Sequence, residues 1–230
     1  MTEFPELVLS AGRIAAQVGL GVLFADLMSG IVHWYIDTYG DPKTPILGKH
    51  VYWPTINHHA QPLDCTRASF WSRNGPLLGL ASVFAVAFLA LGWINAFTLS
   101  ALAAGCFASE LHVWSHKPKR KRPVLVRWLQ SAGLVLTPRE HWQHHTGGHN
   151  RRYCTITNLL NPVLDRLRVF RLIEGVVEGF ARRRPRDEIM GIGPLARSRR
   201  ALSRARRFVA AHAWQARKAL FGPGSHLAIA

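Results

Sequence analysis

The sequence predicts an all-α integral membrane protein with about three transmembrane helices, an interfacial or re-entrant helix and a histidine-rich cap on the cytoplasmic side. Three observations predict this class: long apolar runs, twelve histidines that lie mostly in or beside polar segments, and a formal net charge of +16. Such a charge favours an anionic partner, either nucleic acid or lipid headgroups. The apolar runs are long enough to cross a bilayer, which favours the lipid.

The chain divides into three parts. A polar N-terminal stub (1–12) precedes a membrane domain (13–190), and a basic, amphipathic tail (191–230) follows it. The three cysteines are scattered and form no CxxC pair, which argues against a disulfide framework and a thiolate zinc site.

The membrane spans are predicted from charge-free length. The first is expected at about 13–36. From Gly75 to Ser109 the chain has no Asp, Glu, Lys, Arg or His. A spanning helix needs about 20 apolar residues, so this run predicts a helical hairpin at about 76–116 that turns at Gly92–Asn95.

Polar segments separate the spans. A His-rich connection (37–74) follows the first span, and a basic hinge (117–123) follows the hairpin. The apolar stretch 124–137 contains an arginine and is too short to span, so we expect it to be interfacial or re-entrant. A second His-rich stretch (139–161) comes next.

The orientation follows from Lys and Arg in the short connections. None precedes Arg13 and none lies in the turn at Trp93, whereas 117–122 and the tail are heavily basic. With three spans, this asymmetry predicts an outside N-terminus and cytoplasmic His-rich segments. A fourth span at 124–137 would separate the two His-rich regions, which disfavours it.

The histidines form a constellation rather than a scatter. Candidate ligands are His33 at the end of the first span, the adjacent pair His58 and His59, the HxxxH of His112 and His116, the HxxHH of His141, His144 and His145, and His149. Residues three and four apart share a helix face, and neutral imidazole binds iron, copper and zinc. About eight imidazoles suit two metal ions with positions left open for oxygen.

The bland interpretation of one histidine near a membrane surface is a helix cap or a polar core residue. Three such groups on one side of one membrane favour a metal centre instead. His50 is interpreted as a polar filler, and His212 and His226 receive no role.

Carboxylates accompany the histidines. Asp26, Gly30, His33 and Asp37 recur on one face of the first span, where an ionisable residue is costly. Asp37, Glu110 and Glu140 are candidates to accept a hydrogen bond from a ligand imidazole and so orient it. For Glu140, an ion pair with the neighbouring Arg139 is an equal alternative.

These motifs resemble the plasmanylethanolamine desaturase family, which includes bacterial CarF-type lipid desaturases and the related plant phosphatidylglycerol desaturases. The likeness spans roughly residues 22–190. This chain departs from it at Glu140, where some members of the family carry one more histidine. The matching segments are Asp26–Trp34 with Asp37–Gly40, Asn57–His59, Glu110–His116, Pro138–His145 and Tyr153–Thr157.

The resemblance implies a di-iron centre built from the nine candidate histidines, His149 included. It also implies an O2-dependent desaturation, such as conversion of an alkyl ether phospholipid to its vinyl ether. The sequence shows no flavin or haem motif, so electrons are expected from a separate carrier of the cytochrome b5 or ferredoxin type. The alternatives are an acyl-chain desaturase or hydroxylase acting on another phospholipid, and a metal-binding or metal-transporting membrane protein.

The tail beyond Arg197 interleaves arginines with Phe208, Val209 and Trp214. Beside a membrane domain this basic amphipathic pattern predicts binding to anionic headgroups. No nucleic-acid recognition motif accompanies the charge, so nucleic-acid binding is not expected.

Overall fold

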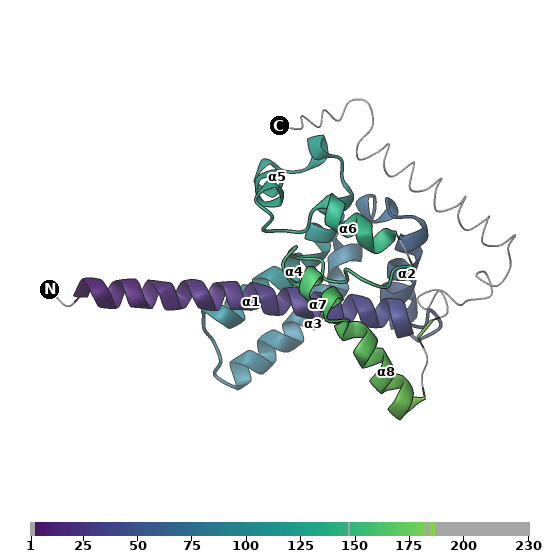
Figure 1. Cartoon of the computed structure of the whole chain (residues 1–230), viewed down its shortest axis with the longest axis horizontal. Coiled ribbons are helices and arrows are strands. Elements are labelled where there is room, and N and C mark those ends of the chain that lie inside the picture. The colour runs from purple at the N-terminus through teal and green to yellow at the C-terminus, as the bar shows by residue number, and fades with distance from the viewer. Residues whose placement is uncertain (1–2, 147, 183–184, 187–230) are drawn as a thin grey trace, which may run out of the picture.

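The computed structural model describes residues 3–146, 148–182 and 185–186, and within these ranges the chain is helical without a β-strand. Three helices are long and apolar enough to cross a membrane (Figure 1): α1 (Glu3–Tyr39), α3 (Phe70–Ala90) and α4 (Ala96–His116). The predicted all-α membrane class and its three spans are confirmed. The predicted tail at 191–230 lies outside the described residues.

Shorter elements connect the spans and cover their ends. They are η1 (Gly48–Tyr52), α2 (Trp53–Ala60), η2 (Asp64–Thr66), η3 (Lys119–Lys121), α5 (Val124–Ser131), α6 (Pro138–His145), α7 (Leu160–Arg166) and α8 (Val169–Ala181). At eight residues α5 is too short to span, as expected.

The first helix is longer than the sequence suggested. It begins at Glu3, inside the expected stub, and Pro5 lies in its first turn, where proline is tolerated. Its 37 residues extend about 55 Å, well beyond the ~30 Å hydrocarbon core. Its N-terminal part runs on past the other helices (Figure 1).

The bundle is built around α4, which packs against both α1 and α3. Gly21 lets α1 approach α4 closely, since a Cβ there would collide with Ser100 and with the carbonyl of Phe97. The Ser100 hydroxyl donates to the Val18 carbonyl across this contact at 3.2 Å. Small residues and interhelical hydrogen bonds are what hold helices together in lipid.

The predicted hairpin turn is present between α3 and α4. Gly92 has φ of +67°, a left-handed conformation that favours glycine. Asn95 then caps α4: its side chain accepts from the backbone N–H groups of Phe97 and Thr98, and the Thr98 hydroxyl accepts from the N–H of Asn95. The turn therefore lies at the end of the bundle opposite His116.

A buried non-helical segment, 153–157, lies along α1. Asp26 accepts hydrogen bonds from the backbone N–H groups of Ile156 and Thr157 at 2.9 and 3.0 Å, and from the Thr157 hydroxyl at 2.6 Å. The Ser29 hydroxyl accepts from the N–H of Thr155. Unpaired backbone is costly away from water, so these α1 side chains make the segment possible at this depth.

Helix α8 packs against the C-terminal end of α1. Phe170 of α8 stacks on Trp34 with ring centroids 5.5 Å apart, and the Trp34 indole donates to Glu174 at 2.8 Å. Trp34, Tyr39, Tyr153 and Phe170 form one buried cluster. This cluster supports the segment on which two of the candidate ligands depend.

Candidate metal centre

The structure gathers the candidate ligands into two adjacent groups at one end of the spans. The five-histidine group consists of His58, His112, His116, His141 and His145. The Asp37 group consists of His33, Asp37, His59 and His144. In each group the ligand atoms, one per residue, all lie within 4.8 Å of one another.

Four helices supply these side chains. The HxxxH of α4 gives both histidines to the five-histidine group, while α6 directs His141 and His145 there and His144 to the Asp37 group. Thr137 caps α6 by accepting from the N–H of Glu140, and Pro138 opens the first turn. The neighbours His58 and His59 of α2 serve different groups.

The spacing of the nitrogens fits shared ions. The Nε2 atoms of His58 and His112 lie 3.0 Å apart, those of His141 and His145 3.0 Å, and those of His59 and His144 3.1 Å. Two nitrogens bound to one ion at about 2.1 Å and at about 90° are about 3 Å apart. The pairs therefore have the separation of ligands on a common metal.

Asp37 lies inside the second group rather than behind it. Its Oδ2 is 3.3 Å from Nε2 of His33, 3.4 Å from that of His59 and 3.3 Å from that of His144. Both carboxylate oxygens are buried and have no hydrogen-bond partner among the described residues. A buried, unpaired carboxylate is costly unless it binds a cation. The structure places the Asp37 carboxylate among the candidate ligand atoms, and its predicted role as an acceptor that orients an imidazole stays a prediction.

Backbone carbonyls orient two of the imidazoles. Nδ1 of His33 donates to the carbonyl of Tyr153 at 3.0 Å, and Nδ1 of His144 donates to the carbonyl of Arg151 at 2.7 Å. Because a carbonyl only accepts, each Nδ1 carries the proton and each Nε2 keeps its lone pair. This fixes the tautomer needed for metal binding.

Burial keeps the imidazoles outside the spans neutral. Desolvation, followed by neighbouring histidines, lowers the pKa of His58, His59, His141 and His145 well below its usual value. Desolvation lowers the pKa of His144 to about 4. Neutral imidazole is the form that ligates metal.

His149 is adjacent to the centre but outside both groups. Its ring stacks on His59 with centroids 4.1 Å apart and planes within 1°. Desolvation and His144 lower its pKa to about 3. His149 therefore lies against the Asp37 group, and its role as a ligand stays a prediction.

The two remaining predicted carboxylates are paired with arginines. Glu110 accepts from Arg73 and from Asn74 at 2.9 Å, and Glu140 accepts from Arg152 at 2.7 Å. Glu140 therefore does form an ion pair, although with Arg152 and not with its neighbour in sequence. Both tie together segments that surround the centre.

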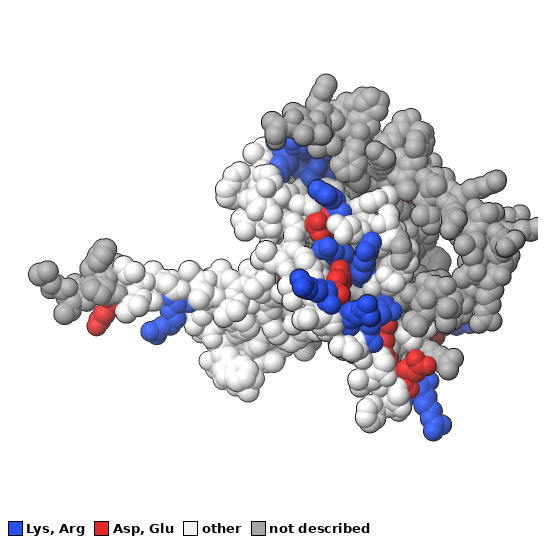
Figure 2. All heavy atoms as spheres, viewed as in Figure 1, with Lys and Arg blue, Asp and Glu red and all other residues white. Residues whose placement is uncertain are grey.

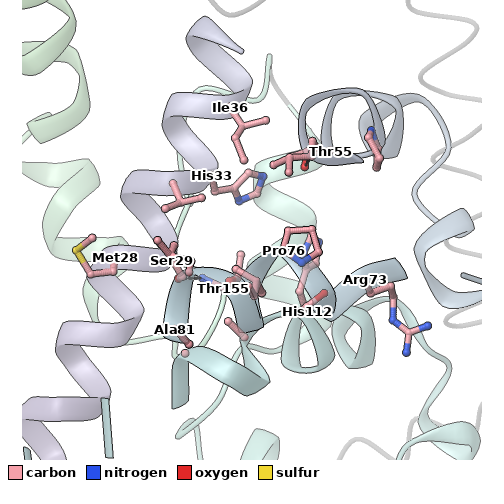
Figure 3. Close-up of a pocket in the computed structure, with 18 of the residues that line it drawn as sticks. Met28, Ser29, His33, Ile36, Thr55, Arg73, Pro76, Ala81, His112 and Thr155 are labelled. Atoms are coloured by element: carbon pink, nitrogen blue, oxygen red, sulfur yellow. Dashed lines mark hydrogen bonds between the residues drawn. The ribbon is translucent and has the colours of Figure 1, made fainter. Parts of the chain in front are cut away.

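An apolar cavity of about 490 Å³ lies between α1, α3 and α4 and reaches both groups. His33, His58 and His112 line it, and Figure 3 shows His33 and His112 facing it from α1 and α4. Its walls are mainly apolar, with Leu80, Phe84, Phe88 and Leu102 among them. Polar side chains also line it: His50 of η1, Asn57 of α2, Asp64 of η2 and Arg73 near the start of α3.

The sequence did not reveal the two orienting carbonyls or the cavity. Any residue can supply a backbone carbonyl. The sequence at Arg151 and Tyr153 therefore gave no signal that these two carbonyls accept hydrogen bonds from imidazoles. A signal for Asp37 existed in its four-residue spacing from His33, which is a ligand spacing as much as a supporting one.

Comparison with known proteins gives a family. The lipid desaturase domain family matches residues 22–188. Fatty acid desaturase 4, chloroplastic, of Arabidopsis thaliana is 36% identical over 160 residues, which are 68% of this chain and 49% of that protein. The chain thus spans about half the length of this plant relative.

Two further relatives carry another name. The plasmanylethanolamine desaturase of Myxococcus xanthus is 33% identical over 187 residues, covering 77% of this chain and 65% of the relative. Plasmanylethanolamine desaturase 1 of Mus musculus is 32% identical over 182 residues, covering 74% and 67%. No solved structure matches the chain. With its three spans and its two ligand groups, the chain belongs to the lipid desaturase domain family.

Proposed function

We propose that this chain is a di-iron, O2-dependent desaturase that converts plasmanylethanolamine, an alkyl ether phospholipid, to its vinyl ether. The observation that carries this proposal is the apolar cavity, which lies among the spans and has histidines of both ligand groups on its wall. A lipid chain in this cavity lies against the metal centre while it stays out of water.

The donor set fits two iron ions. The five-histidine group would hold one, and His33, Asp37, His59 and His144 would hold the other. Imidazole and carboxylate suit iron, and the buried unpaired oxygens of Asp37 need a cation. When bound, iron supplies the O2 chemistry needed to remove hydrogen from an unactivated C–H bond, which no side chain can do.

The cavity favours attack near the headgroup. The cavity wall includes His33, His58 and His112, polar side chains of α2 and η2, and apolar residues of α3 and α4. A phospholipid with its headgroup at the polar part presents its first chain carbons to the centre. Positioning at this level selects which bond is oxidised.

The reaction needs an outside reductant. Removal of two hydrogens from the lipid provides two electrons, and reduction of O2 to two water molecules consumes four. The other two electrons, with two protons, come in this proposal from a separate cytochrome b5- or ferredoxin-type carrier.

The test uses the purified chain in phospholipid vesicles with iron, oxygen and a reduced carrier. One set of vesicles contains plasmanylethanolamine and the other contains diacyl phosphatidylethanolamine of matched chain length. We expect an acid-labile product that lacks two hydrogens from the ether lipid alone, measured by mass spectrometry. His144→Ala serves as the inactive control, and Gly79→Leu, on the exposed side of α3, as the matched active one.

The second candidate is an acyl-chain desaturase or hydroxylase, which the 36% identity to a plant fatty acid desaturase favours. Product from the diacyl lipid alone would establish it and reject the ether substrate. Bound metal without lipid product or oxygen consumption would instead establish a metal-binding or metal-transporting protein.

We also propose that the metal centre faces the cytosol. The centre lies at the end of α4 that continues into Lys117–Lys121, whereas the Gly92 turn at the other end has no basic residue. Basic connections remain on the cytoplasmic side. Labelling of Lys121→Cys by an impermeant thiol reagent only after cell lysis is the expected result; labelling in intact cells would reverse the orientation.

A further inference from the structure

The face of α8 that points away from the protein is apolar. Leu172, Val176 and Phe180 follow one another at four-residue spacing and are 66%, 57% and 89% exposed. Residues four apart share a helix face, so these side chains form one stripe. Isolated exposed apolar residues are ordinary, whereas a continuous stripe marks a contact surface.

The preceding helix, α7, carries a second stripe of exposed apolar side chains. Leu159, Val163 and Leu167, at the same four-residue spacing along α7, are 54%, 52% and 60% exposed. α7 and α8 contact each other and are joined by Arg168 in a left-handed conformation. We call these six side chains the α7–α8 apolar face.

Contacts on the opposite side of α8 show where this helix lies along the first span. Phe170 and Glu174 contact Trp34, which lies in the last two turns of the first span. Helix α8 therefore starts beside the C-terminal end of the first span. Figure 1 shows α8 leaving α1 at an angle instead of running along it.

Charge surrounds this face in the pattern of an in-plane helix. Arg166, Arg168 and Arg182 are exposed at the ends of α7 and α8. On the face shown in Figure 2, basic and acidic side chains alternate in a band that extends to this end of the molecule, while the rest of the visible bundle surface is uncharged apart from the N-terminal part of α1. Arginines beside an apolar stripe suit the boundary between anionic headgroups and acyl chains.

We infer that the α7–α8 apolar face is immersed in the headgroup–acyl boundary of the bilayer, so that α7 and α8 form a membrane-embedded, non-spanning element. This inference depends on insertion of the three spans and not on the desaturase reaction. A second copy of the chain on this face is the competing occupant.

Hydrogen bonds also connect α8 to the surroundings of the metal centre. Arg171 donates to the carbonyl of Asn150 and contacts the hydroxyl of Tyr153 at 3.4 Å, while it pairs with Glu174. The same stretch carries the carbonyls of Arg151 and Tyr153, which orient His144 and His33. Through these contacts α8 supports the segment that orients two histidines of the Asp37 group.

The test measures depth on two sides of α8. A nitroxide is attached to Val176→Cys on the apolar face or to Glu178→Cys on the polar side, in the full-length chain in vesicles. The background carries Cys65→Ser and Cys106→Ala, while Cys154 is kept because it is 0% exposed. Relaxation by oxygen, which partitions into lipid, is compared with relaxation by a water-soluble nickel chelate.

We expect relaxation by the nickel chelate to be lost at position 176 while relaxation by oxygen is retained, with the reverse preference at position 178. Equal access of the chelate to both positions would place the face in water and overturn the inference. Exclusion of both reagents from position 176 would show protein on the face and equally overturn it. Activity and metal content of the same samples report separately on the proposed function.

Discussion

Two aspartates on one helix have opposite environments, and their roles differ accordingly. Asp26 accepts three hydrogen bonds from the 153–157 segment, so its charge is used to hold backbone. Asp37 has no hydrogen bond among the described residues and is surrounded by three imidazole nitrogens. The sequence shows that both carboxylates are unusual in a span. It does not show that Asp26 binds backbone groups whereas Asp37 lies among the candidate ligands.

In the proposed di-iron centre, Asp37→Asn should remove one iron and leave the fold intact. The amide keeps the shape of the side chain but loses the negative charge, so the iron content should fall by about half while the five-histidine group stays loaded. Iron per chain, measured by elemental analysis, checks this. Full iron content with unchanged activity would show that Asp37 is not a ligand.

Asp26→Asn is the matched substitution with the opposite result. It weakens charge-assisted hydrogen bonds to Ile156 and Thr157, and such bonds contribute about 1.5–3 kcal/mol each. The melting temperature in detergent should fall by roughly 5 °C or more. A variant that melts like the wild type but lacks iron would assign Asp26 to the metal centre.

At the scale of elements, the metal centre depends on how closely the 153–157 segment lies on α1. Gly30 makes this approach possible, because a Cβ there would lie 2.6 Å from Sγ of Cys154. One turn further along α1, His33 is oriented by the carbonyl of Tyr153. The glycine therefore determines the position of a ligand that it does not contact.

Gly30→Ala should displace the segment and loosen His33. Overpacking of this kind costs about 1–3 kcal/mol, and we expect reduced iron retention during dialysis. The double variant Gly30→Ala with Cys154→Ala removes the sulfur and should recover most of the loss, since the next contacts are 3.3 and 3.4 Å. Absence of recovery would mean that the segment does not transmit the change.

The elements with the strongest patterns were predictable. Charge-free length located the spans, and the turn at Gly92 and Asn95 followed from its residues. Helix α8 was not predicted, because thirteen residues that mix Val169, Arg171, Glu174 and Phe180 resemble the basic region that follows. Its contact with Trp34 joins residues 140 positions apart, and local sequence carries no record of such a contact.

At the scale of the whole molecule, the centre and the cavity form one site because three spans meet there. The histidine spacing predicted that ligands converge, and the structure adds their division into two groups. The division could not be predicted, since it depends on how α2 packs against α1 and α6 against α4. The cavity depends on the same packing.

Filling the cavity should change which lipids react. Gly105 of α4 lines it, and a Cβ there meets nothing within 4 Å, so Gly105→Leu should fold normally and occupy space meant for a lipid chain. We expect turnover of long-chain substrates to fall by about tenfold or more, and that of shorter chains to fall less. Competition between chain lengths, followed by mass spectrometry, measures this.

Gly79→Leu is the control, because Gly79 is equally open but does not line the cavity. An identical loss of turnover in both variants would show that the leucine acts on the bundle and not on the substrate.

His58 and His59 are adjacent in sequence, which fixes the distance between one backbone position of each ligand group. Successive Cα atoms across a trans peptide are about 3.8 Å apart, and these two residues belong to different ligand groups. A single rigid peptide unit thus joins a residue of one group to a residue of the other. Bilayers of different thickness can tilt the long helices, but the spacing of these two backbone positions stays the same.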